Sequence, residues 1–176
     1  MKKQRINLEI SANDKGAHSN EENQNSRCSI KVYKDNYFRK NAVLDTKDAV
    51  DIVQNYLGER DREHLSIICL NTRCEPTHLQ IVAIGDLYHS TVHPRALMKV
   101  PILSNAASII ITHNHPSGDV TPSPQDIEIT HLMKQVCHIM QINLWDHIIY
   151  SGENYYSILQ ESPIFNHDLL PTDEDE

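Results

Sequence analysis

The chain has 176 residues with a formal net charge of −8, and 39% of them are apolar, which suits a single domain of ordinary size. No apolar run approaches the 18 or so residues that a membrane-spanning helix requires. The basic start MKKQR is not followed by the apolar stretch of a secretory signal, so we expect a cytoplasmic protein with no membrane segment.

The two ends of the chain differ in composition from its middle. Residues 1–27 hold 6 apolar residues and residues 161–176 hold 4, whereas 59 of the 133 residues over 28–160 are apolar. We predict a disordered polar arm over 1–27, a folded domain over 28–160, and an acidic flexible tail over 161–176.

The first half of the predicted domain alternates strand and helix signals. A short strand over 29–33 precedes a helix that follows the capping pair Asp45-Thr46. Two apolar runs, 65–70 and 78–84, are joined by a short polar link and predict an antiparallel strand pair.

The next segments combine a helix with a buried strand. Residues 94–105 are predicted to be helical, although Pro101 inside them costs about 3 kcal/mol or forces a kink, so we expect the helix to break there. An apolar strand over 108–112 follows, and a loop rich in proline and glycine spans 113–122.

The last helix has the clearest start of any element. Ser123 is its predicted N-cap, with Pro124 in the first helical position and Asp126 in the third. Its apolar positions are Ile127, Leu132, Val136, Ile139 and Met140. Strands over 143–150 and 155–159, with a turn at Ser151-Gly152, complete an α/β domain in which helices cover a mixed β-sheet.

A candidate metal site lies where the buried strand ends. His113 and His115 are two residues apart, which places them on the same side of an extended chain, and Asp126 follows on the first turn of the next helix. Two imidazoles and a carboxylate are ligands that zinc accepts, and a fourth position left to water is typical of a catalytic site. The alternative is a solvent loop that merely contains two histidines.

The segment HNHPSGDVTPSPQD, residues 113–126, resembles the metal-binding signature of JAB/MPN (JAMM-type) metallopeptidases, most closely the RadC branch. Other similar blocks occur in the same order, at 61–72, 92–98, 105–118, 126–130 and 144–150. The resemblance covers roughly residues 46–160. It implies a mixed β-sheet sandwiched by helices, an architecture shared with cytidine deaminases.

The resemblance also implies roles for individual residues. His113, His115 and Asp126 would bind Zn²⁺, Ser123 would help to hold the oxyanion of a tetrahedral intermediate, and Glu63 would be the general base. Ser123 has a competing role as N-cap, and Glu63 has a competing interpretation as a surface carboxylate.

Other acidic residues fit the role of general base less well than Glu63. Glu75 lies at the far end of the first core strand, and Glu128 is turned about 200° around the helix from Asp126. Glu59 is the next candidate if Glu63 is not the base.

Asp146 and His147 belong to one of the similar blocks. As neighbours on a strand they point to opposite faces, so at most one of them approaches the metal. That residue would support the ligands rather than bind the metal.

Two function classes remain after these observations. The first is a zinc metallopeptidase or isopeptidase that hydrolyses an amide bond of an unknown peptide or protein. The alternative is a non-catalytic RadC-like interaction protein associated with DNA repair or a mobile element. A zinc nucleobase deaminase is excluded because its HxE…PCxxC signature is absent.

Charge and cysteine content limit the partners further. From residue 75 onward three basic side chains accompany thirteen acidic ones, and the helix-hairpin-helix module common in RadC-like proteins has no counterpart before residue 46. Direct binding to nucleic acid is therefore not expected. The four cysteines form no CxxC pair, so a zinc ribbon is excluded and reduced thiols are expected. The sequence does not predict an oligomeric state.

Overall fold

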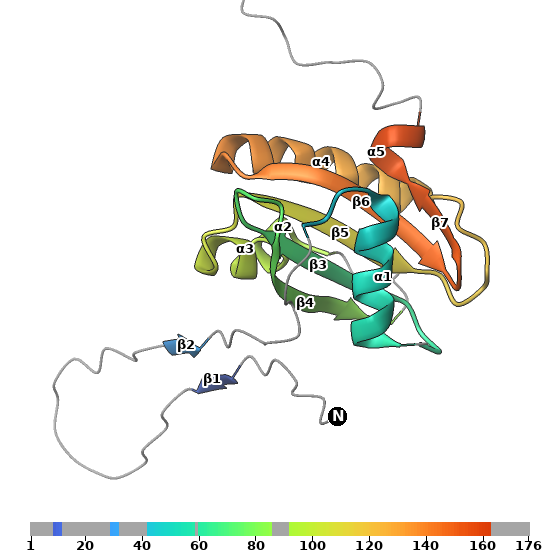
Figure 1. The fold of residues 1–176 in the computed structure, drawn as a ribbon, viewed down its shortest axis with the longest axis horizontal. Coiled ribbons are helices and arrows are strands. Elements are labelled where there is room, and N and C mark those ends of the chain that lie inside the picture. The colour runs from blue at the N-terminus through green and yellow to red at the C-terminus, as the bar shows by residue number, and fades with distance from the viewer. Residues whose placement is uncertain (1–8, 12–28, 32–41, 59, 86–91, 163–176) are drawn as a thin grey trace, which may run out of the picture. The chain divides into compact units, whose positions relative to one another are not determined.

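A five-stranded mixed sheet with the order β4-β3-β5-β6-β7 organises the main part of the chain in the computed structural model (Figure 1). The structure describes residues 9–11, 29–31, 42–58, 60–85 and 92–162. All neighbouring strands are antiparallel except β5 and β6, which are parallel. The strands are β3 (His64–Leu70), β4 (Pro76–Ile84), β5 (Ser108–Asn114), β6 (Asn143–Ser151) and β7 (Asn154–Ser157). The predicted mixed α/β sheet and its antiparallel β3–β4 pair are confirmed.

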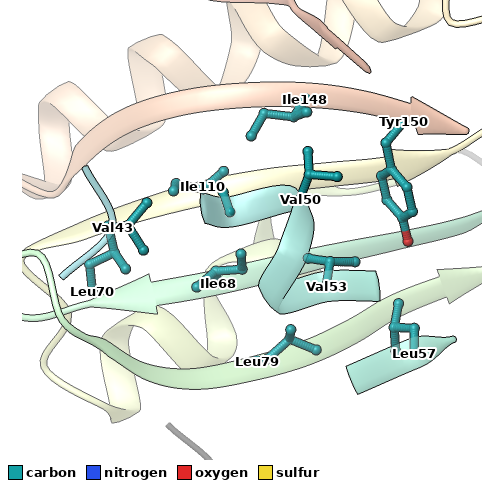
Figure 2. Close-up of a cluster of buried hydrophobic side chains, with 11 residues drawn as sticks. Val43, Val50, Val53, Leu57, Ile68, Leu70, Leu79, Ile110, Ile148 and Tyr150 are labelled. Carbon is teal, nitrogen blue, oxygen red and sulfur yellow. The ribbon is translucent and has the colours of Figure 1, made fainter. Parts of the chain in front are cut away.

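One face of the sheet is covered by α1 (Thr46–Leu57) (Figure 1). The helix begins where the side chain of Asp45 accepts a hydrogen bond of 2.8 Å from the backbone N–H of Asp48. It ends at Gly58, whose φ of 67° favours glycine. Figure 2 shows Val50, Val53 and Leu57 of this helix lying over side chains of the strands. Those strand residues are Ile68, Leu70, Leu79, Ile110, Ile148 and Tyr150.

The opposite face carries α4 (Pro124–Met140), which contacts β6, and α2 (Pro94–Leu97), which contacts α4. Alternation along β5 separates the two faces: Ile110 packs against α1, whereas His113 contacts Asp126 of α4. A last short helix, α5 (Ile158–Glu161), follows β7 and contacts β6. The site residues therefore lie on the α4 face, at the carboxyl end of β5.

The predicted helix over 94–105 is two short helices, α2 and α3 (Lys99–Leu103), separated at Met98. We expected the break at Pro101, so this position was wrong. Ending the first helix at Leu97 makes Pro101 the third residue of α3, within the first turn, where a backbone N–H has no partner inside the helix. The proline is thus accommodated without a kink of its own.

The buried face of α4 differs from the predicted one. Its buried residues are Asp126, Thr130, Met133 and Cys137, whereas Leu132, Ile139 and Met140 are exposed. The predicted face was based on the apolar residues of the helix. The buried face instead begins with two polar residues, Asp126 and Thr130, whose side chains make hydrogen bonds at the site. The N-terminal features of this helix, Ser123 as N-cap and Pro124 in the first position, are confirmed.

The predicted end of the last strand and the turn before that strand need smaller corrections. The predicted strand over 155–159 stops at Ser157, whose side chain accepts a hydrogen bond from the N–H of Gln160 and begins α5. The preceding turn consists of Gly152 and Glu153, because Ser151 still pairs with Asn154.

The N-terminal segment forms a separate unit, residues 1–37. Within it β1 (Glu9–Ser11) pairs antiparallel with β2 (Ser29–Lys31), and β2 coincides with the start of the strand predicted over 29–33. Most of the predicted polar arm, and residues 163–176 of the predicted acidic tail, lie outside the described residues. None of the helices in the described ranges combines the length and apolar character of a membrane-spanning segment.

Candidate metal centre

Strand β5 delivers two histidines to one place. His113 is its sixth residue and is 2% exposed, and His115 lies just beyond its end. The backbone N–H of His115 donates to the carbonyl of Tyr150 at 2.9 Å, so the chain still follows β6 after β5 ends. The loop then turns at Gly118, whose N–H donates to the carbonyl of His115 and whose φ is 92°. The two imidazole rings meet edge to face with centroids 4.6 Å apart.

Asp126 reaches the same place from the first turn of α4. The helix begins with a capping box: the Ser123 side chain accepts from the N–H of Asp126, and the Asp126 carboxylate accepts from the N–H of Ser123 at 2.9 Å. The Ser123 hydroxyl also donates to Oδ2 of Asp126 at 2.6 Å. In this arrangement the hydroxyl is committed to Asp126, so a role in holding an oxyanion requires its hydrogen to turn away from the carboxylate.

The buried imidazole of His113 lies between two carboxylates. Its Nδ1 is 3.0 Å from Oδ1 of Asp126, and its Nε2 is 3.6 Å from Oε2 of Glu63. Nε2 of His115 is 3.9 Å from Oδ2 of Asp126. The predicted residues Glu63, His113, His115 and Asp126 are therefore brought together, and Ser123 is hydrogen-bonded to one of them.

The donor set fits a zinc ion. Glu63, His113 and His115 offer one ligand atom each, and these atoms lie within 4.8 Å of one another. Tetrahedral ligands at about 2.1 Å from zinc lie about 3.4 Å from one another, and the 3.6 Å between Nε2 of His113 and Oε2 of Glu63 is close to that value. Asp126 is not one of these three residues, and its 3.0 Å contact is with the other ring nitrogen of His113, Nδ1. Nε2 of His113 is buried and has no hydrogen-bond partner among the described residues, which is costly unless a further group binds there.

The second nitrogen of His115 is already used. Its Nδ1 lies 2.7 Å from the main-chain carbonyl of Asp119, to which it can donate. A carbonyl that accepts from one ring nitrogen leaves the other nitrogen deprotonated and aims it, as is usual for histidines that bind metals. Nε2 of His115 therefore faces the site as a potential ligand.

The charge state of Asp126 suits a ligand or a charged partner of histidine. Burial by itself raises the pKa of this carboxyl, but hydrogen bonds from His113 and Ser123 and the nearby imidazoles outweigh burial and hold its pKa well below the usual range. Asp126 is therefore ionised over the whole range in which the protein is expected to work.

His147 lies behind this cluster, and Asp146 does not. Nδ1 of His147 is 2.6 Å from the Thr130 hydroxyl, which in turn bonds to the main-chain carbonyl of Asp126. Burial lowers the pKa of His147 to about 3, so the ring is neutral near pH 7. Asp146 instead accepts from Ser157 and Thr46 on the α1 face. The predicted opposite orientation of this pair is confirmed.

The competing acids are placed as the sequence predicted. Glu128 is exposed, and Glu75 binds Asn71 beyond the other end of β3. Glu59 lies outside the described residues.

Two residues that contact the site were not predicted, Thr130 and Asn114. Thr130 is a polar residue one helical turn after Asp126, and Asn114 is a buried polar residue between two histidines. Both positions carried a sequence signal, since a polar side chain on an otherwise buried strand or helix face needs a hydrogen-bond partner.

Comparison with known proteins agrees with the sequence blocks. A UPF0758 protein of Chlorobium phaeovibrioides is 37% identical over 132 residues, which are 75% of this chain and 58% of the relative. A UPF0758 protein of Clostridium acetobutylicum is 40% identical over 132 residues, 75% of this chain and 57% of the relative. A third, of Chlorobium chlorochromatii, is 38% identical over 125 residues, 71% of this chain and 55% of the relative.

These relatives are longer than the matched region, so the chain spans little more than half of their length. A family model described as the RadC-like JAB domain matches residues 43–163, which contain the whole sheet and every residue of the candidate metal centre. The chain belongs to the RadC-like JAB domain family.

Proposed function

We propose that the chain is a zinc-dependent metallopeptidase or isopeptidase of the JAMM type, which hydrolyses an amide bond with zinc-activated water. The observation that carries this proposal is the convergence of two imidazoles and two carboxylates at the end of β5, where Nε2 of His113 is buried without a hydrogen-bond partner among the described residues. A scaffold protein has no need for such a set on a buried strand end.

In this proposal His113, His115 and Asp126 hold the metal. Zinc, when bound, supplies a Lewis acid that polarises the scissile carbonyl and lowers the pKa of water. Glu63 takes a proton from the attacking water and passes it to the nitrogen of the leaving amine, as the C–N bond breaks. Its position supports this role, because its carboxylate lies beside the imidazole cluster and its side chain is 32% exposed, so that both water and substrate can reach it.

The geometry also supports a second division of labour between the carboxylates. Glu63 could be the third ligand, with Asp126 acting as the carboxylate partner of Nδ1 of His113. The two divisions differ in which carboxylate is needed for metal binding.

A pair of variants distinguishes a base from a ligand. Glu63→Gln keeps size and hydrogen bonding but removes the basic carboxylate, and Asp126→Ala removes the proposed ligand. We expect Glu63→Gln to retain zinc near the level of the parent and to lose about 10²- to 10⁴-fold in turnover. Asp126→Ala should bind zinc more weakly. Loss of zinc in Glu63→Gln with retention in Asp126→Ala would reverse the two assignments.

The activity itself is tested by exposing the zinc-loaded protein to a mixture of peptides and to peptides joined through a lysine isopeptide bond. Mass spectrometry detects products, and the Glu63→Gln variant is the control for contaminating proteases. We expect cleavage by the parent only. A zinc-loaded parent that leaves both sets intact, or cleavage at equal rate by Glu63→Gln, would count against the catalytic proposal and favour the non-catalytic, RadC-like interaction protein.

The partner of this site is proposed to be a peptide or protein, and direct binding to nucleic acid is not part of the proposal. A cytoplasmic location is retained as a proposal, because Cys69, Cys74 and Cys137 are free thiols in the structure. Burial raises the pKa of Cys69 to about 12 and that of Cys137 to about 11, which keeps both thiols protonated and poorly reactive.

A further inference from the structure

Asn114, the residue between the two histidines, connects the end of β5 to the segment that carries Glu63. Its Oδ1 accepts a hydrogen bond of 2.7 Å from the backbone N–H of His64, and its Nδ2 donates a hydrogen bond of 2.9 Å to the carbonyl of Arg62. One amide group therefore binds the chain immediately before and immediately after Glu63. Asn114 is 6% exposed, so these contacts are shielded from water.

This contact stands where the backbone pairing of the two strands ends. The last paired residues of β3 and β5 are Leu65 and His113, and the next pair in register would be His64 and Asn114. At this point β5 continues beside β6, where Asn114 pairs with Tyr150. The side chain of Asn114 thus supplies to His64 an acceptor that the backbone of β5 no longer supplies.

Two further bonds hold the segment around Glu63. The carbonyl of Glu63 accepts from the N–H of Gly85 at 2.9 Å, and Nδ1 of His64 lies 2.8 Å from the carbonyl of Arg62. The amide of Asn114 makes its two bonds to this segment from β5, the strand that bears His113. It therefore sets the position of the Glu63 backbone relative to His113. In that position Oε2 of Glu63 lies 3.6 Å from Nε2 of His113.

We propose that Asn114 is a positioning residue that holds the Glu63 carboxylate beside the histidine cluster. The inference rests on the proposed function, in which Glu63 moves the proton. The amide is suited to this task because it offers one acceptor and one donor in a fixed plane. Aspartate has no donor for the Arg62 carbonyl, and alanine has neither group.

The test compares Asn114→Ala with Asn71→Ala. Asn71 is a matched control because its side chain also makes main-chain bonds, accepting from the N–H groups of Arg73 and Glu75 beyond the opposite end of β3. Both variants lose main-chain hydrogen bonds of a turn or strand end, but Asn71 is not connected to Glu63. Circular dichroism establishes that each variant is folded, and Asn114→Ser replaces Asn114→Ala if the latter is not.

We expect Asn114→Ala to keep zinc, since His113, His115 and Asp126 remain, and to lower kcat about 10- to 100-fold with KM nearly unchanged. Asn71→Ala should keep the kcat of the parent. In the Glu63→Gln background the Asn114→Ala change should lose its effect, because the carboxylate that it positions is gone. Equal losses in the two backgrounds, or an equal loss in Asn71→Ala, would overturn the proposal.

A second readout does not depend on turnover. In cobalt(II)-loaded protein the visible spectrum changes with pH as groups at the metal ionise. We expect the midpoint of that change to shift in Asn114→Ala in the same direction as in Glu63→Gln, and to stay in place in Asn71→Ala. An unshifted midpoint in Asn114→Ala, alongside a shifted one in Glu63→Gln, would refute the positioning role. A parent that binds cobalt but cleaves no peptide would instead refute the proposed function while leaving this readout in force.

Discussion

Replacing Asp146 with asparagine perturbs a buried carboxylate on the α1 face, away from the metal centre. Asp146 is 3% exposed, and its Oδ1 accepts from the Ser157 hydroxyl and from the N–H of His147, each at 2.8 Å. Its Oδ2 lies 3.4 Å from the hydroxyl of Thr46. Asparagine keeps an acceptor for the first two groups, and its amide can donate to Thr46. The substitution therefore removes a charge and keeps the shape.

The magnitude follows from the pKa. Burial is the largest influence and outweighs these hydrogen bonds, so the pKa of Asp146 rises from 3.8 to about 6. The folded protein then binds this proton more tightly than the unfolded chain, so stability is lost as the pH rises from 4 to 6, and this group causes no further change with pH above pH 6. A shift of about two pH units corresponds to about 3 kcal/mol.

The assay is urea unfolding of parent and Asp146→Asn at intervals from pH 4 to pH 7. Subtracting the two curves cancels the contributions of every other titrating group that the variants share. We expect the free energy of unfolding of Asp146→Asn, relative to the parent, to rise by about 3 kcal/mol over that range, with zinc content unchanged. Parallel stability curves for the two proteins would refute the reasoning.

The remaining predictions concern the start of α4 and the absence of nucleic-acid binding. Ser123→Ala removes the N-cap of α4 and should lower stability by about 1 kcal/mol in thermal unfolding. Ser123→Asn restores a cap without a hydroxyl and should recover that stability. If Ser123→Asn also recovers full turnover, the oxyanion role of Ser123 is wrong. Fluorescence anisotropy with duplex DNA at about 150 mM salt should show only weak binding, because as few as three basic residues follow position 74. A sequence-specific complex with a nanomolar Kd would contradict this expectation.

Local sequence patterns predicted most of the structural elements that position the site residues. The apolar strand ending at two histidines, and the helix beginning at Ser123, are short-range patterns whose physical causes lie within a few residues. Asp126 could be placed because a capping box fixes the direction of the third helical residue. Glu63 is far in sequence from these residues, and it was identified through the family resemblance rather than through any local pattern.

The predictions that failed depend on tertiary contacts. Apolar residues indicated the wrong face of α4, because Thr130 is buried to bond His147 on a strand that follows it in the chain. The break between α2 and α3 lies at Met98 rather than at Pro101, since a proline is tolerated in a first turn. Asn114 was passed over because its partners lie about fifty residues earlier, on a segment that only the folded sheet brings alongside.

Metal content tests the central claim most directly. Protein purified without chelator is analysed for metals, as the parent, as His113→Ala and as His131→Ala, the last being a control at an exposed histidine of α4. We predict one zinc per chain in the parent and in His131→Ala, and much less in His113→Ala, which removes the imidazole that lies between Glu63 and Asp126. A parent without stoichiometric metal, or a His113→Ala variant that retains it fully, would contradict the account of this centre.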